Sequence, residues 1–355
     1  MAAKEHIPEA AGRLPSHDLG RAQSATPRAS VEVDTVRGAI GTDLLGATLM
    51  HEHIFVISRE ILDNMPGVWD EERYVAEAIE QLQELHGLGI TSIVDPTIIG
   101  LGRYIPRIER VARATNLNII VGTGIYAYAE MPHYFRLRGP GMMWGGPDPI
   151  VELLRSDVLE GIGGTSVKAS FLKFATETEG VTPDVARIMS ATCDVHLETG
   201  APILTHSNAS SETGLVQQAF LSERGVDLTR VLIGHVGDST DLDYLMRLAD
   251  QGSILGMDRF GYTPLVDTRT RVEIVKRLCD RGYADRMVLG HDYGCFSDLV
   301  PADVRAQHLP DLSYTFISRS VLPLMRDVGV SQTHIDMMLT DNPRRFFESR
   351  VAGGG

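Results

Sequence analysis

An apolar run that ends in two histidines, Leu44-Leu45-Gly46-Ala47-Thr48-Leu49-Met50-His51-Glu52-His53, decides the fold of this chain. Because side chains alternate between the two faces of a strand, His51 and His53 would project to the same side, roughly 6.6 Å apart along the backbone. Two imidazoles with this spacing are typical of a metal site, although paired histidines also occur in ordinary cores and turns. The motif alone leaves both interpretations open.

Three later segments repeat the pattern of a short apolar run that ends in a side chain able to bind a metal. They are Ile203-Leu204-Thr205-His206, Val231-Leu232-Ile233-Gly234-His235 and Met287-Val288-Leu289-Gly290-His291-Asp292. In a barrel of parallel strands the functional side chains gather where the strands end. We therefore expect one site that contains His51, His53, His206, His235 and Asp292.

Strand-like runs alternate with helical patterns from residue 41 onward, as in βα units around a parallel sheet. The predicted strands cover residues 47–53, 91–96, 118–126, 169–175, 202–206, 231–235, 253–259 and 287–292. The clearest helical patterns cover 71–86, 184–198, 212–223, 241–250 and 268–280. An open doubly wound sheet would usually carry a glycine-rich loop after its first strand, where this chain has His-Glu-His. We therefore predict a single α/β domain over 31–351, a (β/α)8 TIM barrel with its site at the carboxyl ends of the strands.

Two long segments interrupt this alternation, 129–149 and 293–318, and both contain prolines. Segments of this length in a compact domain are usually lids or substrate walls, so we expect both to take part in substrate selection.

Composition narrows the class of protein. The net charge is −14, from 33 basic and 47 acidic residues, which argues against nucleic acid or an anionic membrane as a partner. No run reaches the roughly 20 apolar residues that a membrane-spanning helix needs. The three cysteines are too few for a disulfide framework in a chain of this length, which favours a cytoplasmic location. Residues 1–30 read as a disordered extension and 352–355 as a flexible tail.

The number of candidate ligands predicts two metal ions. Four histidines and one aspartate exceed what one catalytic tetrahedral ion with an open position can use. Imidazole and carboxylate suit zinc, iron, manganese or cobalt without distinguishing between them. Two ions at close range need a bridging anion, and the fourth strand should supply it.

The candidate for this bridge is Lys173, in Phe171-Leu172-Lys173-Phe174-Ala175. A buried ammonium is costly and would repel two cations, whereas a carbamate formed from the amine and carbon dioxide would be an anionic bridge with two oxygens. Two alternatives stay open at this point: Lys173 faces solvent, or Glu177 just beyond the strand is the bridge. His291 adjoins Asp292 on the opposite face of its strand, and we interpret it as a structural histidine.

Several motifs together resemble the phosphotriesterase family of the amidohydrolase superfamily over roughly residues 31–351. The matching residues are His51-Glu52-His53, Phe171-Leu172-Lys173, Thr205-His206-Ser207, Ile233-Gly234-His235, Gly290-His291-Asp292 and Asp341-Asn342-Pro343. More narrowly, the chain looks like the phosphotriesterase-like lactonases, which open N-acyl homoserine lactones (quorum quenching) and often hydrolyse organophosphates. The segments that carry this narrower likeness are Gly122-Thr123-Gly124-Ile125-Tyr126, Gly234-His235-Val236-Gly237-Asp238, Leu255-Gly256-Met257-Asp258-Arg259-Phe260-Gly261 and His291-Asp292-Tyr293.

The resemblance implies a role for each residue of the expected site. His51, His53 and Asp292 would hold a more buried ion, and His206 and His235 a more exposed one. A carbamate on Lys173 and a hydroxide would bridge the two ions. Tyr126 would contact the lactone ring, Arg259 would border the pocket and influence substrate choice, and Asp292 would accept the proton of the hydroxide. The resemblance also implies a homodimer.

Three function classes follow from these residues. The first is a metal-dependent lactonase with side activity on phosphotriesters. The second is a primary phosphotriesterase or another carboxylic ester hydrolase on the same site. The third is a barrel that binds a ligand without turnover, and the full set of ligands argues against it.

Overall fold

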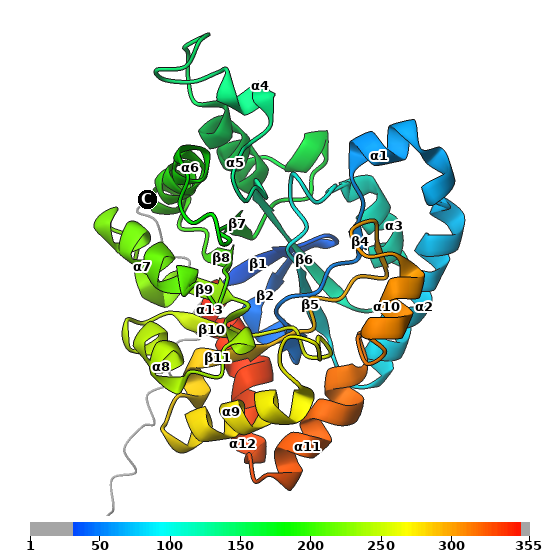
Figure 1. Ribbon diagram of the computed structural model, residues 1–355. Coiled ribbons are helices and arrows are strands. Elements are labelled where there is room, and N and C mark those ends of the chain that lie inside the picture. Colours follow the sequence, from blue (N-terminus) through cyan, green and yellow to red (C-terminus); the bar gives the residue numbers. More distant parts are fainter. Residues whose placement is uncertain (1–30, 349–355) are drawn as a thin grey trace, which may run out of the picture. The chain divides into compact units, whose positions relative to one another are not determined.

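The computed structural model describes residues 31–348, and its centre is an eight-stranded parallel sheet (Figure 1). The strands follow one another in chain order, and a hydrogen bond of 2.9 Å from the backbone N–H of Met50 to the carbonyl of Leu289 joins the first to the last. This closes the sheet into the predicted barrel. The strands are β3 (Thr48–Leu49), β5 (Ser92–Asp95), β6 (Asn118–Gly124), β7 (Phe171–Ala175), β8 (Ile203–His206), β9 (Val231–Gly234), β10 (Ile254–Met257) and β11 (Met287–Leu289).

Alternation along each strand divides the apolar residues between two buried layers. One set fills the barrel interior, where Val94, Ile120, Leu204, Leu232 and Val288 belong to one cluster. Their neighbours in sequence belong to a second cluster that packs beneath the helices. Strands that are buried on both faces read as continuous apolar runs, which is why the strands of this barrel could be recognised in the sequence.

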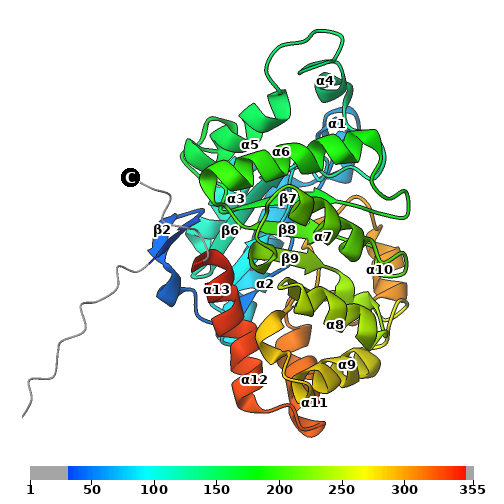
Figure 2. The ribbon, with the colours of Figure 1, turned by 90° about the vertical axis from the view of Figure 1, so that its left-hand side faces the viewer.

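Helices surround the barrel, and Figure 2 shows several of them side by side on its outer face. Side chains cap the starts of many of them: Asp70 accepts a hydrogen bond from the backbone of Arg73, and Thr182 accepts one from Val185. The predicted helices are confirmed within a few residues. The α-helices are α1 (Arg59–Asn64), α2 (Glu71–Gly87), α3 (Ile105–Ala114), α4 (His133–Arg136), α5 (Pro149–Leu159), α6 (Pro183–Thr199), α7 (Thr213–Glu223), α8 (Leu242–Asp250), α9 (Thr268–Asp280), α10 (Ala302–His308), α11 (Leu322–Asp327), α12 (Gln332–Asp336) and α13 (Asn342–Glu348).

Shorter helical segments connect these elements. Two are π-helical, η7 (Ile317–Val321) and η8 (Met337–Asp341). The remainder are single 3-10 turns: η1 (Thr42–Leu44), η2 (Pro66–Val68), η3 (Ile162–Gly164), η4 (Leu228–Arg230), η5 (Val236–Asp238) and η6 (Ala284–Arg286).

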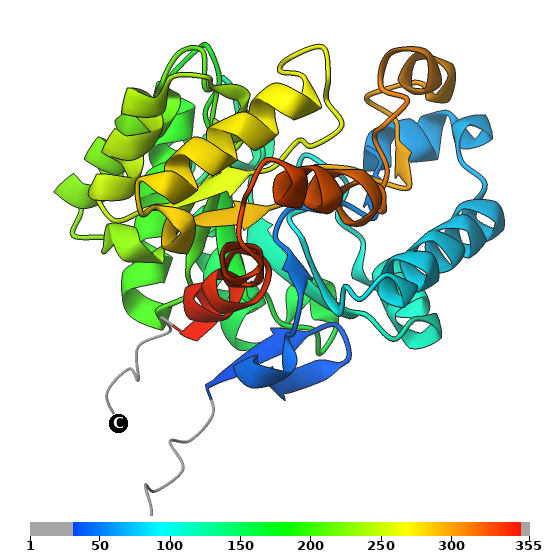
Figure 3. The ribbon, with the colours of Figure 1, turned by 90° about the horizontal axis from the view of Figure 1, so that it is seen from below.

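An antiparallel hairpin that the sequence did not predict precedes the barrel. Its strands are β1 (Glu32–Thr35) and β2 (Gly38–Gly41), and Val33 packs into the interior cluster with Phe346 and Phe347. Figure 3 shows this hairpin in dark blue beside the last helices, in red. The hydroxyl of Thr42, just after the hairpin, donates to Glu348 at 2.9 Å. The two ends of the described chain therefore meet at the face of the barrel opposite the site.

The second long segment is not one loop. It contains β12 (Phe296–Ser297), which pairs with β4 (Phe55–Val56), and then helix α10. No helix within residues 31–348 is both long and apolar enough to cross a membrane. The predicted extensions at 1–30 and 352–355 lie outside the described residues.

Candidate metal centre

Six side chains that the sequence singled out line one open pocket of about 170 Å3 at the carboxyl ends of the strands. They come from five strands or the residues just after them, so only the closed barrel brings them together. Tyr126 and Arg259 line the same cavity. The six are His51, His53, Lys173, His206, His235 and Asp292.

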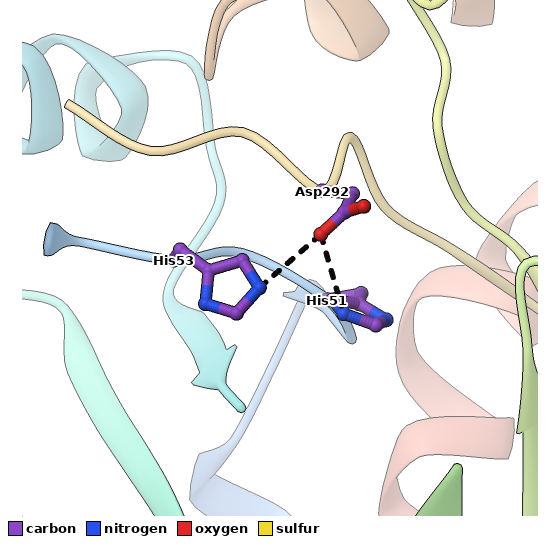
Figure 4. Close-up of side chains that lie close together, drawn as sticks. All are labelled: His51, His53 and Asp292. Carbon is purple, nitrogen blue, oxygen red and sulfur yellow. Dashed lines mark ion pairs between the residues drawn. The ribbon is translucent and has the colours of Figure 1, made fainter. Parts of the chain in front are cut away.

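Three of these side chains converge on one point (Figure 4). Oδ1 of Asp292 lies 3.4 Å from Nε2 of His51 and 3.2 Å from Nε2 of His53. Ligands held at 2.0–2.2 Å around a tetrahedral ion would be roughly 3.3 Å apart, so these separations fit a divalent cation. The donor set, two imidazoles and a carboxylate, suits the same ions.

The Nδ1 atoms of His51 and His53 make hydrogen bonds on the side of each ring away from Asp292. Nδ1 of His51 lies 3.0 Å from Oδ2 of Asp258, and Nδ1 of His53 lies 2.7 Å from the hydroxyl of Thr97, which in turn donates to Asp95. A neutral imidazole has one N–H and one lone pair, so a hydrogen bond from Nδ1 leaves the lone pair on Nε2. Both lone pairs therefore face Asp292.

Asp258 is a functional residue that sequence reasoning missed. Its second oxygen lies 2.9 Å from Nδ1 of His235 and also accepts a hydrogen bond from the backbone N–H of His235. One buried carboxylate thus orients His51 and His235, whose rings are 4.7 Å apart. These three residues could also be taken as a metal site of their own. The separations are those of hydrogen bonds, and we interpret Asp258 as the partner that orients both rings.

Lys173 points into the barrel and is 1% exposed. Its Nζ lies 3.2 Å from Nε2 of His51. Burial lowers the pKa of its amine to about 8, which makes the neutral form far more accessible than in a solvated lysine. The alternative in which this side chain faces solvent is wrong.

His206 and His235 form the second pair, with ring centroids 4.4 Å apart. Nδ1 of His206 lies 3.1 Å from the hydroxyl of Tyr126, and its Nε2 lies 2.7 Å from Oε1 of Glu177. Glu177 does not line the cavity, so the structure does not favour it as the bridge between two ions.

Burial keeps His51, His206 and His235 neutral near pH 7. It lowers the pKa of His51 to about 4, and it also depresses the pKa values of His206 and His235. Metal ions bind the neutral imidazole, so the site is prepared for a cation without first losing protons.

A chain of charges runs beside the site. Arg259 donates from Nε to Oδ2 of Asp292 at 3.0 Å and from Nη1 to Asp238 at 2.8 Å. The buried Arg271 contacts the other oxygen of Asp238. Arg259 therefore occupies one oxygen of Asp292 and leaves Oδ1 for the histidines.

Left-handed backbone conformations mark the ends of three strands in the site. His235, Arg259 and Asp292 have φ values of 64°, 66° and 55°. Such values are uncommon outside glycine and cluster at functional sites, where surrounding contacts stabilise them. They also explain why the predicted strands 231–235, 253–259 and 287–292 are too long, since these residues leave the sheet.

The walls of the cavity are mostly apolar and come largely from the second long segment. Leu299, Val300, Leu309 and Leu312 line it, and Val56 from β4 does so too. Among the described residues, the first long segment, 129–149, contributes no side chain to this lining. The expected role in substrate selection therefore has support for 293–318 alone.

His291 has the structural role that the sequence predicts. Its Nδ1 lies 2.7 Å from Oε1 of Glu52, and its Nε2 accepts a hydrogen bond from the backbone N–H of Ile317. Both nitrogens are used, so this ring has no lone pair to offer a metal.

Comparisons with known proteins agree with this geometry. The model of the phosphotriesterase family matches residues 31–347. A phosphotriesterase homology protein from Mycobacterium tuberculosis is 49% identical over 89% of this chain and 98% of the relative. An aryldialkylphosphatase from Saccharolobus solfataricus is 38% identical over 85% of this chain and 95% of the relative. A solved structure of the phosphotriesterase from Mycobacterium tuberculosis superposes with a TM-score of 0.88 at 48% identity, over 90% of this chain and 98% of the other.

Proposed function

This chain belongs to the phosphotriesterase family, and on that premise we propose that it is a metal-dependent lactonase with side activity on phosphotriesters. The proposed substrates are N-acyl homoserine lactones and related lactones. The observation that carries the proposal is a cavity with two chemistries: histidines, a lysine and an aspartate at its base, and leucine and valine side chains along its wall. A polar ring opened at the base and an acyl chain along the wall would match them.

The proposed centre holds two divalent ions. His51, His53 and Asp292 would bind one, and His206 and His235 the other. A carbamate on Lys173 would bridge them: the neutral amine attacks carbon dioxide, an N–C bond forms, and one proton is lost to give an anion with two oxygens. The lowered pKa of the Lys173 amine supports this step because the attacking form is the neutral one. An acid-labile increase of about 44 daltons in intact mass, dependent on metal, would detect the carbamate.

When bound, the two ions would supply a hydroxide nucleophile near neutral pH and polarise the substrate's carbonyl or phosphoryl oxygen. Tyr126 would donate a hydrogen bond from its hydroxyl to the oxygen that becomes negative, since burial raises the pKa of this phenol and keeps it protonated. Oδ2 of Asp292 lies 3.9 Å from Nε2 of His235 while Oδ1 lies near His51 and His53, so the carboxylate faces both ligand sets. Its Oδ2 is the oxygen nearer the second set. It would accept the proton of the nucleophile and pass it to the leaving alkoxide. Arg259, bonded to the same oxygen, would fix its direction.

A primary phosphotriesterase is the second candidate, and the name of the Saccharolobus relative, an aryldialkylphosphatase, favours it. The test compares kcat/KM for a long-chain N-acyl homoserine lactone and for paraoxon on one metal-loaded preparation. A higher value for the lactone supports the lactonase, and a higher value for paraoxon supports the phosphotriesterase. Absence of turnover on both, with two ions bound, would contradict both and support a binding barrel or another ester hydrolase.

We propose further that the protein is a cytoplasmic homodimer, an expectation that rests on the family resemblance and on the cysteine content. Light scattering coupled to size-exclusion chromatography would give twice the monomer mass for a dimer.

A further inference from the structure

We propose that Glu177 is a positioning residue for the more exposed ion, because it fixes the ring orientation in which His206 would bind this ion. This inference rests on the proposed two-ion centre. It concerns a carboxylate outside the ligand set.

The contact between Glu177 and His206 is short and largely shielded from water. Oε1 of Glu177 lies 2.7 Å from Nε2 of His206, whose side chain is 2% exposed, and the Glu177 side chain is 19% exposed. A carboxylate only accepts hydrogen bonds, so Nε2 of His206 must carry the proton and Nδ1 the lone pair.

The other three histidines of the centre have the opposite arrangement. His51 and His235 direct Nδ1 to Asp258, and His53 directs Nδ1 to Thr97. Each of these rings therefore presents Nε2 to the cavity. His206 is the exception among the four, and the reversal follows from Glu177, which approaches its ring from the Nε2 side.

Glu177 is itself held in place by a neighbouring loop. Nδ2 of Asn208 donates to Oε2 of Glu177 at 2.7 Å, while Oδ1 of Asn208 accepts from the backbone N–H of Ser211 and from the hydroxyl of Ser210. The carbonyl side of the Asn208 amide is thus already occupied, which directs its NH2 group to Glu177. The result is a supported carboxylate, like the partners that orient metal-binding histidines elsewhere.

This arrangement should affect one ion more than the other. The more buried ion has three protein ligands besides the bridge, and the more exposed ion has two, His206 and His235. Losing the orientation of one ligand out of two weakens a site more than losing one out of three. Glu177 therefore acts on the ion with the smaller ligand set.

The experiment measures metal content and affinity in Glu177→Ala and Glu177→Gln, with Glu179→Gln as the matched control. Glu179 is an exposed acid two residues further along the same segment. Each purified protein is loaded with zinc, dialysed against graded concentrations of a chelator, and analysed for zinc per chain. We expect Glu177→Ala to retain one ion as the unmodified chain does and to bind the second 10–100-fold more weakly. Glu177→Gln, whose amide oxygen can still accept from Nε2, should lose less, and Glu179→Gln should not differ.

The outcomes separate this inference from the proposed function. If the unmodified chain binds two zinc ions and Glu177→Ala binds both of them as tightly as the unmodified chain does, the role of Glu177 alone is overturned. A second ion lost in Glu177→Ala, without turnover of lactone or paraoxon by the zinc-loaded unmodified chain, would support the role and overturn the proposed activity. Failure of the unmodified chain to bind two ions would overturn both.

A crystal structure of the zinc-loaded, unmodified chain tests the inference without any variant. We expect zinc 2.0–2.1 Å from Nδ1 of His206, with Glu177 still on Nε2. Zinc on Nε2, or on a Glu177 oxygen, would overturn the role of Glu177.

Discussion

At the scale of single residues, the centre depends on side chains that would not themselves touch a metal. His51, His53, His206 and His235 each have one nitrogen held by a neighbour, and Asp258 serves two of them. The chemistry of the rings is therefore set by hydrogen bonds made on the side away from the cavity.

Asp258→Ala should weaken both ions together. Alanine offers no acceptor oxygen, so the rings of His51 and His235 both lose the partner that orients them. We expect metal affinity and kcat/KM to fall about 10–100-fold. Zinc titration against a chelator checks this, with the exposed Asp243→Ala as control. Loss of one ion only, as expected for Glu177→Ala, would contradict the shared role.

Carbamate formation on Lys173 should depend on pH in a defined direction. The lowered pKa, about 8, means that the fraction of reactive neutral amine rises with pH, is one half at that value and nears completion about one to two pH units above it. At a fixed concentration of dissolved carbon dioxide, reconstitution of the metal-free protein with zinc should therefore accelerate from about pH 6 and level off at roughly pH 9–10. Activity recovered over time reports the rate. Lys173→Arg, which stays protonated, should not recover at any pH, and a rate independent of pH would argue against the amine.

The residues that could be predicted from the sequence were those with metal-binding side chains at the end of an apolar run, such as His51-Glu52-His53 and Asp292. Asp258 and Glu177 could not be assigned in the same way. Their roles depend on hydrogen bonds to rings on other strands, and Asp258 lies 207 positions from His51. No local pattern carries such information.

At the scale of elements, the barrel strands were visible because their residues are buried on both faces. The β1–β2 hairpin was missed because its strands are only four residues long and partly exposed. Helix α10 was missed because it is short and no residue in it is buried. Elements that bury few apolar side chains produce no clear apolar periodicity in the sequence.

The segment from β12 to α10 should control acyl-chain preference. Leu299 lines the cavity and is 67% exposed, so it lies at the mouth and can be enlarged without disturbing the core. Leu299→Trp should lower kcat/KM for a long-chain lactone several-fold and leave a short-chain lactone nearly unchanged. Leu265→Trp, at another exposed leucine outside this lining, is the control. An equal loss for both chain lengths would indicate damage to the centre instead.

At the scale of the whole molecule, the bound ions should contribute to stability, because the folded chain gathers ligands that are scattered in the unfolded one. A ligand present at 100 times its Kd stabilises the folded state by about 2.7 kcal/mol. Removing the metal with a chelator should therefore lower Tm by roughly 5–10 °C, and zinc should restore it. Differential scanning calorimetry measures both steps. A Tm unaffected by chelation would mean that bound metal contributes nothing to the free energy of unfolding.

The seam between β3 and β11 has a consequence for how the protein matures in the cell. His51 and His53 follow the first barrel strand and Asp292 follows the last, and 239 positions separate their neighbours Glu52 and His291, which also pair. During synthesis on the ribosome, the early histidines emerge long before the aspartate that completes their triad. Stable loading of the proposed inner cation would then await synthesis of nearly the entire polypeptide, and truncated translation products would lack it.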